Sequence, residues 1–209
     1  MKFKICGLNN ISTIECCEKN EVDYFGMIFY DKSPRYISLL ESEKLVQYSI
    51  NKKIEPVGVF VNESIEKIDH IIKKLELRNV QLHGNEGNDF ISSIKKLTNV
   101  KIFKAISTRS KKDLEKIEKF KNVDFFLLDY KPEINELPGG NAKQFDWNLI
   151  KNLKMEKPWF ISGGINEENI DKIKDFANPD GIDLSSGVEE SPGIKNNNMI
   201  SSLFKKYNA

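Results

Sequence analysis

Residues 57–82 read VGVFVNESIEKIDHIIKKLELRNVQL, and they contain the unit from which the whole fold is predicted. The run 57–61 is continuously apolar, which is typical of a parallel strand that is covered on both faces. Ser64 stands at the N-cap position of a helix with one charged face and one apolar face. The apolar face carries Ile65, Ile68, Ile72 and Leu75. A second apolar run begins at Asn79, so the stretch predicts a strand, a crossover helix and a parallel strand.

The same alternation recurs along the whole chain. Eight β-rich runs begin near Lys2, Tyr24, Glu55, Asn79, Lys101, Val123, Trp159 and Gly181. Most of them are roughly 22–24 residues apart, which is the length that a strand and its crossover helix need. Between the last two runs, Asn166 is expected to cap a helix and Pro179 to end it.

Eight strand–helix units predict an α/β fold, a single-domain (β/α)8 TIM barrel over residues 1–209. The chain is compact for that fold, which typically takes about 250 residues. An open, doubly wound sheet is the alternative. The segment Cys6-Gly7-Leu8-Asn9-Asn10 after the first strand lacks the glycine fingerprint of such sheets, so the barrel is favoured.

Composition and charge narrow the class of protein. The 32 Lys and Arg residues nearly balance the 31 Asp and Glu residues, and a nucleic-acid-binding domain usually shows a basic excess. No run of about 18 apolar residues exists, and the N-terminus lacks the apolar core of a signal peptide. The three cysteines are too few for a disulfide framework and fit a reducing compartment. We therefore expect a cytoplasmic protein with no nucleic-acid or membrane partner.

The active site of a TIM barrel forms at the C-terminal ends of the strands, and two reactive side chains stand there. Cys6 ends the first strand, either as a functional thiol at the barrel mouth or as a small buried hydrophobe. Asp129 ends the strongly apolar run that begins at Phe125. Burial raises the pKa of a carboxyl group, which suits a general acid, and a capping aspartate is the alternative interpretation.

Other polar residues follow the second and fourth strands. Arg35 lies in a loop stiffened by Pro34 and is either a surface arginine or a planar fork for a carboxylate or phosphate. Gln81 and His83 share one face of their strand, where they either meet a ligand or satisfy each other in a structural network. His70 lies off the apolar stripe of its helix and is expected to be exposed.

Small residues follow the last two strands. The turns Gly163-Gly164 and Ser185-Ser186-Gly187 allow backbone N–H groups to approach an anion closely. In barrels, the loops after strands seven and eight frequently bind phosphate with the help of a short helix, which the segment after Pro192 is expected to supply. These turns predict a phosphate site, although tight turn chemistry alone would also explain them.

Taken in chain order, these segments and several others resemble the phosphoribosylanthranilate isomerase family of tryptophan biosynthesis. The matching segments include Lys4-Ile5-Cys6-Gly7-Leu8, Lys32-Ser33-Pro34-Arg35-Tyr36-Ile37, Val80-Gln81-Leu82-His83-Gly84, Leu127-Leu128-Asp129, Phe145-Asp146-Trp147, Ile161-Ser162-Gly163-Gly164-Ile165 and Asp183-Leu184-Ser185-Ser186-Gly187-Val188-Glu189. They run from the first strand to the last helix, so the resemblance covers essentially the whole chain.

The resemblance implies a (β/α)8 barrel that uses no metal and no organic cofactor. It implies an Amadori rearrangement of N-(5-phosphoribosyl)anthranilate to 1-(2-carboxyphenylamino)-1-deoxyribulose 5-phosphate. Cys6 matches the general base of the family, Asp129 its general acid, and Arg35 the arginine that meets the anthranilate end. The implied partner is a small phosphorylated aminosugar, bound by a monomer or a homodimer.

Further substrate contacts are expected as well. The turns Gly163-Gly164 and Ser185-Ser186-Gly187 match the phosphate site of the family. Gln81, His83 and Asp183 are expected to bind the rest of the substrate.

The chain departs from the family pattern in the loop between Tyr130 and Phe145. The glycine-rich run of the family is here Gly139-Gly140-Asn141-Ala142-Lys143-Gln144, without its second glycine motif and its usual threonine, and residues 133–137 lengthen the loop. This departure motivates one alternative, a barrel that binds a phosphate ligand without turnover. Another phosphosugar isomerase or a metal-dependent epimerase is a second alternative, but of the histidines only His83 is well placed for a metal.

Overall fold

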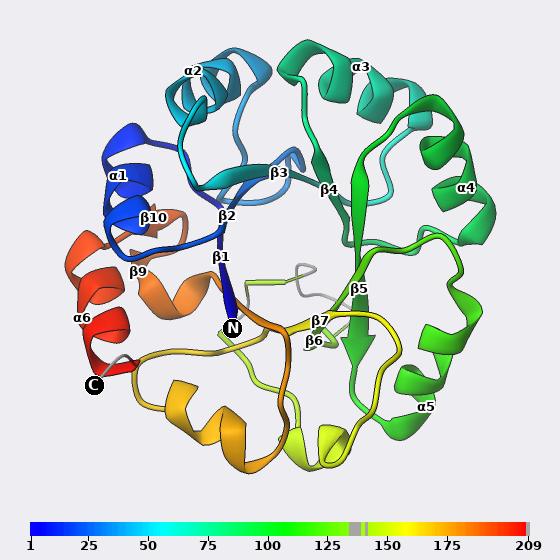
Figure 1. The fold of residues 1–209 in the computed structure, drawn as a ribbon, viewed down its shortest axis with the longest axis vertical. Coiled ribbons are helices and arrows are strands. Elements are labelled where there is room, and N and C mark those ends of the chain that lie inside the picture. Colours follow the sequence, from blue (N-terminus) through cyan, green and yellow to red (C-terminus); the bar gives the residue numbers. More distant parts are fainter. Residues whose placement is uncertain (134–138, 141, 208–209) are drawn as a thin grey trace.

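The computed structural model describes residues 1–133, 139–140 and 142–207. Eight parallel strands close into a barrel in which each strand pairs with the next and β8 pairs with β1 (Figure 1). The strands are β1 (Lys2–Cys6), β2 (Tyr24–Ile28), β3 (Glu55–Phe60), β4 (Asn79–Leu82), β5 (Lys101–Thr108), β6 (Phe125–Tyr130), β7 (Trp159–Ile161) and β8 (Gly181–Leu184). The predicted TIM barrel is therefore confirmed.

A ring of helices surrounds the barrel (Figure 1). The α-helices are α1 (Ile11–Lys19), α2 (Leu39–Ser49), α3 (Ile65–Leu75), α4 (Asn88–Leu97), α5 (Lys111–Leu114) and α6 (Asn197–Tyr207). The 3-10 helices are η1 (Glu115–Lys119), η2 (Trp147–Ile150), η3 (Ile170–Asp175) and η4 (Ser186–Val188). In α3, the Ser64 hydroxyl accepts a hydrogen bond from the Lys67 N–H at 3.2 Å, and His70 is exposed, as the sequence predicts. No helix within the described residues is long and apolar enough to cross a membrane.

One helix prediction near the last strands is wrong. The segment between β7 and β8 forms η3 instead of a capped α-helix, and the Asn166 side chain accepts a hydrogen bond from the Glu168 N–H in a tight turn before it. A helix does follow Pro192, namely α6, while a second, short helix, η4, lies directly after β8. Pro192 itself lies in the hairpin between β9 (Glu189–Ser191) and β10 (Ile194–Lys195), where Gly193 adopts a φ of 88° that closes the turn.

Inward-facing side chains divide the barrel interior into an apolar half at the N-terminal ends of the strands and a polar half at their C-terminal ends. Tyr24, Phe103 and Phe160 fill the end where the strands begin, with ring centroids 5.5 to 6.1 Å apart in edge-to-face contacts. Above them the interior holds polar groups, among them Lys4 and Asp183, which are paired residues of β1 and β8. Because aromatic side chains fill the half at the N-terminal ends of the strands, the open end of the barrel lies at the C-terminal ends.

The long loop after β6 is described only in part. Residues 134–138 and Asn141 lie outside the described residues, so the lengthening expected at 133–137 is described only at Glu133. The described positions Gly139 and Gly140 lie at the mouth of the barrel, where both line the pocket described below.

Candidate active site

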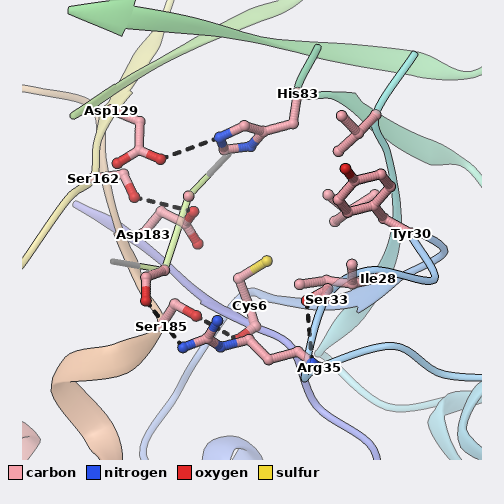
Figure 2. Close-up of a pocket in the computed structure, with 14 residues that line it drawn as sticks. Cys6, Ile28, Tyr30, Ser33, Arg35, His83, Asp129, Ser162, Asp183 and Ser185 are labelled. Carbon is pink, nitrogen blue, oxygen red and sulfur yellow. Dashed lines mark hydrogen bonds and ion pairs between the residues drawn. The ribbon is translucent and has the colours of Figure 1, made fainter. Parts of the chain in front are cut away.

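One pocket at the C-terminal mouth gathers six of the predicted site residues, among them Ser185 of the predicted phosphate turn. Cys6, Arg35, His83, Asp129 and Asp183 all line it, and they come from the ends of β1, β4, β6 and β8 and from the loop after β2 (Figure 2). They approach one another only through closure of the barrel. The pocket therefore occupies the position that the strand-end rule predicts.

Asp129 is almost fully buried and sits in a hydrogen-bond chain. Its Oδ2 lies 3.1 Å from His83 Nε2, and its Oδ1 accepts a hydrogen bond from the Tyr130 N–H at 2.8 Å. His83 Nδ1 lies 2.7 Å from Gln81 Nε2. This pattern fits a neutral imidazole that accepts from the Gln81 amide at Nδ1 and donates from Nε2 to the carboxylate.

Gln81 lies behind His83 and does not line the pocket. Its Oε1 is buried and has no hydrogen-bond partner among the described residues. Rotation of this amide by half a turn would present Oε1 to a protonated Nδ1, so Gln81 is compatible with either tautomer of His83. The structure gives Gln81 the place of a residue that orients His83.

A buried ion pair secures the loop that follows His83. Lys104 Nζ lies 3.0 Å from Glu86 Oε2 and donates to the Gly84 carbonyl at 2.7 Å. Glu86 Oε1 accepts from the Asn62 N–H at 2.8 Å, which joins the loops after β3 and β4. Since both charged groups are satisfied, the network holds the backbone next to His83 in one position.

Cys6 shares the barrel interior with a second buried ion pair. Lys4 Nζ lies 2.9 Å from Asp183 Oδ1, and both side chains are at most 3% exposed. Burial raises the pKa of the Cys6 thiol, and the Lys4 ammonium opposes that effect. Burial alone would lower the pKa of Lys4, but the Asp183 carboxylate and the Cys6 sulfur together outweigh burial, so the pKa is raised and Lys4 stays protonated.

Arg35 is buried and already bound on one edge. Its Nε and Nη2 donate to the two carboxylate oxygens of Glu189 at 2.8 and 2.7 Å, and Nη2 also donates to the Gly140 carbonyl at 3.2 Å. Lys195 donates to the same carboxylate. Burial alone would raise the pKa of Glu189, but the hydrogen bonds from Arg35 and Lys195 lower it. Arg35 therefore enters the pocket as a cation whose orientation is set before any ligand binds.

We expect Glu189→Gln to raise KM about 10- to 100-fold with a smaller change in kcat. The variant removes a charge-assisted bidentate contact of about 1.5–3 kcal/mol and frees the Arg35 guanidinium, which lines the pocket. Steady-state kinetics check the split between KM and kcat. Glu190→Gln is the matched control, because Glu190 is exposed on the same strand and should behave like the wild type. An unchanged KM in Glu189→Gln would contradict this role.

A second pocket adjoins the first and is lined by the small-residue turns. Gly163 and Gly164 adopt φ values of 90° and 63°, and both line it together with Ser185 and Ser186. Lys143 lines the same pocket, and its Nζ lies 5.7 Å from the centroid of the Tyr130 ring. This is a concave surface of glycines, hydroxyl groups and an ammonium group, as an anion site requires.

Gly187 does not line this second pocket. A Cβ at Gly187 would lie 1.9 Å from the Ile165 carbonyl oxygen, so the glycine allows the loops after β7 and β8 to touch. The structure thus gives Gly187 a packing role next to the predicted phosphate turn.

The two pockets share the residues between them. Asp129, Gly139, Gly140, Ser162, Asp183 and Ser185 line both pockets. The first pocket also has an apolar wall formed by Ile28, Tyr30, Val59 and Val61. The joined cavity therefore runs from Arg35 and an apolar wall, past Asp129, to the small-residue turns.

Gly139 and Gly140 cover the mouth of the joined cavity. Gly140 adopts a φ of 71°, and a Cβ there would lie 2.3 Å from Arg35 Nη1. A Cβ at Gly139 would lie 3.2 Å from His83 Nε2 and 3.3 Å from Asp129 Oδ2. The backbone of these two glycines therefore packs directly against the predicted site residues, and a side chain at either glycine would interfere with that contact.

We expect Ala142→Gly to raise the free energy of unfolding by up to about 1 kcal/mol. Ala142 adopts a φ of 54°, and the left-handed region costs an L-residue about 1–2 kcal/mol. Part of the gain is offset by the larger entropy of a glycine in the unfolded chain. Denaturant titration checks the sign. Ala177→Gly, at a residue outside the left-handed region, is the control and should lower stability; a loss in Ala142→Gly would refute the strain.

The sequence analysis missed three charged residues of the site, which are Lys4, Glu189 and Lys195. Lys4 stands two residues before Cys6, and the period of a strand already places both on one face. Glu189 lies 154 positions from its partner Arg35, and no local pattern predicts such a contact. Across the part of the chain that the structure describes, no three His, Cys, Asp or Glu side chains form a group that could hold a metal ion.

Comparison with known proteins covers nearly the whole chain. A family model described as N-(5'-phosphoribosyl)anthranilate (PRA) isomerase matches residues 3–206. The chain belongs to this family. An N-(5'-phosphoribosyl)anthranilate isomerase of Caldanaerobacter subterraneus subsp. tengcongensis is 39% identical over 206 residues, which are 99% of this chain and 97% of that protein. The family that the sequence resembles is thereby confirmed.

Solved PRA isomerases share the fold. Monomers generated from the dimeric enzyme of Thermotoga maritima superpose with a TM-score of 0.84 at 32% identity, over 100% of this chain and 98% of that one. A PRA isomerase in complex with reduced 1-(o-carboxyphenylamino)-1-deoxyribulose 5-phosphate gives a TM-score of 0.84 at 30% identity, with the same coverage.

Proposed function

We propose that the chain rearranges N-(5'-phosphoribosyl)anthranilate to 1-(2-carboxyphenylamino)-1-deoxyribulose 5-phosphate, a step of tryptophan biosynthesis, with Cys6 as general base and Asp129 as general acid. Membership of the PRA isomerase family supports the reaction. One observation carries the assignment of roles: Asp129 lines both halves of the joined cavity, and Cys6 lines the half with the apolar wall. Asp129, the proposed acid, thus lies between the pocket proposed for the anthranilate end of the substrate and the pocket proposed for its phosphate end.

The proposed substrate has an anionic group at each end, and the cavity has a matching partner for each. Arg35, oriented by Glu189, suits the carboxylate of the anthranilate. The backbone at Gly163-Gly164 and the hydroxyls of Ser185 and Ser186 suit the phosphate. The aromatic ring would then lie on the apolar wall. Anchoring at both ends sets the geometry of the reacting carbons, which is a major source of rate enhancement.

In the proposed first step, Asp129 starts in its protonated form and donates that proton to the ring oxygen of the furanose, and the carboxylate that remains accepts from His83 Nε2. The C1–O bond of the ring breaks, and the amine nitrogen forms a double bond to C1, which gives an open-chain iminium ion. His83 touches the other side of the carboxyl group through Nε2, so it holds the acid in place. General acid catalysis of this kind contributes about 10²–10⁴-fold to rate.

In the proposed second step, the Cys6 thiolate removes the proton from C2. The iminium ion withdraws electrons from C2 and makes its proton acidic, and the electron pair of the broken C–H bond moves to form an enol. The Cys6 thiol then returns a proton to C1 and the Asp129 carboxylate takes the hydroxyl proton, which gives the ketone and restores both side chains to their starting forms. A thiol with an ordinary pKa of about 8.5 is only a few per cent ionised near pH 7, so positive charge close to Cys6 aids this step.

The test of the proposed function is identification of the product. PRA is generated in situ from anthranilate and phosphoribosyl pyrophosphate by a separate transferase, and the mixture is separated after addition of this protein. The expected result is conversion to the deoxyribulose isomer that chelators do not prevent, because acid and base side chains suffice for the chemistry. Tight binding of the ligand without product would instead identify a non-catalytic barrel, the alternative that the residues 141–144 motivate.

We further propose that the protein works in the cytoplasm, with this phosphorylated aminosugar as its partner, without nucleic acid, as a monomer or a homodimer. The nearly neutral charge and the unpaired cysteines Cys6, Cys16 and Cys17 support a reducing compartment and no polyanionic partner. A related enzyme is described as dimeric. Sedimentation across a range of protein concentrations tests the oligomeric state.

A further inference from the structure

Lys4 and Cys6 point into the barrel from the same face of β1 and meet across Gly26 of β2. A Cβ built at Gly26 would lie 2.8 Å from Cys6 Sγ and 3.3 Å from Lys4 Nζ, so the absence of a side chain there lets the sulfur and the ammonium be neighbours. Lys4 Nζ is fully buried and lies 2.9 Å from Asp183 Oδ1. A fully buried lysine inside a barrel is costly, and its partner carboxylate comes from the neighbouring strand.

We propose that Lys4 is a positioning residue for the reaction, whose ammonium group stabilises the thiolate form of Cys6, and that Asp183 limits how much positive charge Lys4 presents to the sulfur. The proposal rests on the role given above to Cys6 as the base. Lys4 keeps its proton throughout, while the sulfur accepts the C2 proton of the substrate and releases it again.

Other charged groups also lie close to Cys6. They come from other strands and loops, whereas Lys4 lies on β1 together with Cys6. From β10 comes Lys195, whose charge is bound by Glu189 of β9. Arg35, from the loop after β2, is bound by the same carboxylate. Across the pocket stand His83 and Asp129, which are hydrogen-bonded to each other. Lys4 and Asp183 are the pair on β1 and β8, the strand of Cys6 and its neighbour, so changes in that pair should act most directly on the thiol.

The experiment measures alkylation of Cys6 by iodoacetamide as a function of pH, read by mass spectrometry of the Cys6 peptide in a Cys16→Ser background. The midpoint of the rate profile reports ionisation of the thiol, whereas changes in access alter only the plateau. We expect Lys4→Met to raise the midpoint by about 1–2 pH units and Asp183→Asn to lower it by about 1 pH unit. The opposite signs are decisive, because simple loss of packing would not move the midpoint in opposite directions.

The variants are chosen so that a folding defect leaves the test intact. Lys4→Met leaves a buried carboxylate without its cation, so it is also measured as the double variant Lys4→Met/Asp183→Asn, whose midpoint should fall between those of the single variants. Asp183→Asn retains an amide oxygen that accepts from Lys4, and its lowered midpoint alone decides the question. Lys2→Met, near the start of the same strand, is the matched control and should leave the midpoint unchanged. An unchanged or raised midpoint in Asp183→Asn would overturn the proposal.

Steady-state kinetics of the same variants test whether the effect of Lys4 on the Cys6 thiol matters for the reaction. In Lys4→Met, kcat at neutral pH should fall about 10-fold with KM unchanged, and it should recover as the pH rises above the new midpoint. Alkylation needs no substrate, so the two proposals fail separately. Shifted midpoints without isomerase activity would refute the proposed function alone, and normal activity with unshifted midpoints would refute the role of Lys4 alone.

Discussion

Cys6→Ala should lose about 10²–10⁴-fold in kcat while it binds the substrate nearly as well as the wild type. The variant removes the proposed base and leaves Arg35 and the proposed phosphate turns unchanged. The side chain is small and buried, so alanine leaves only a minor cavity and the barrel should stay folded. Steady-state kinetics give kcat, and calorimetry with a reduced product analogue gives the affinity.

The matched control for this variant is Cys16→Ser. Cys16 lies on α1, where its sulfur contacts the Asn197 carbonyl and the Ser201 hydroxyl outside the barrel. Serine retains those polar contacts, so the control should keep the kcat of the wild type. A Cys6→Ala protein with more than a tenth of the wild-type kcat would remove Cys6 from the mechanism and restore its interpretation as a small buried hydrophobe.

Asp129→Asn should cause a loss of similar size, about 10²–10⁴-fold in kcat, with little loss of affinity. Asparagine has the shape of aspartate: its oxygen still accepts from the Tyr130 N–H, and its Nδ2 donates to His83 Nε2 in the tautomer that a rotated Gln81 amide supports. An amide does not, however, donate a proton to the ring oxygen as a carboxylic acid does. Single-turnover measurements locate the block. The intact furanose should persist on the enzyme, because ring opening precedes removal of the C2 proton.

An exposed carboxylate provides the comparison for Asp129. Asp171 lies on η3, where its side chain is 42% exposed and 3.9 Å from Lys206, so Asp171→Asn should leave both kcat and the affinity unchanged. If Asp129→Asn retained full kcat, the acid would have to come from another group of the joined cavity. If it lost affinity as strongly as kcat, Asp129 would be a binding residue instead.

The sequence predicts the barrel because its signals are local and repeated. The capped, amphipathic helix that begins after Ser64 and the apolar run before it depend on residues close in the chain, and both form as predicted. The segment after Asn166 fails for the opposite reason. It carries a cap and an apolar stripe, but the span between β7 and β8 also contains the Gly163-Gly164 turn and Pro179, and it forms the tighter η3.

The candidate site is only partly predictable from the sequence. Cys6 and Asp129 stand at strand ends, where the barrel rule directs attention, and both line the cavity. From the sequence, the guanidinium of Arg35 is expected to be available for a ligand on all its edges. In the structure Glu189 binds one edge of it, because the hairpin of β9 and β10 folds back over the loop after β2. Contacts of this kind join distant parts of the chain, and periodicity holds no information about them.

The most direct test of the account follows the loss of PRA fluorescence after addition of wild-type protein or Cys6→Ala to substrate generated in situ. The account predicts rapid loss with the wild type and a rate at least about 10²-fold lower with Cys6→Ala at equal, saturating substrate. No loss with the wild type would contradict the proposed isomerase activity. Equal rates for the two proteins would contradict the central claim that Cys6 is the base.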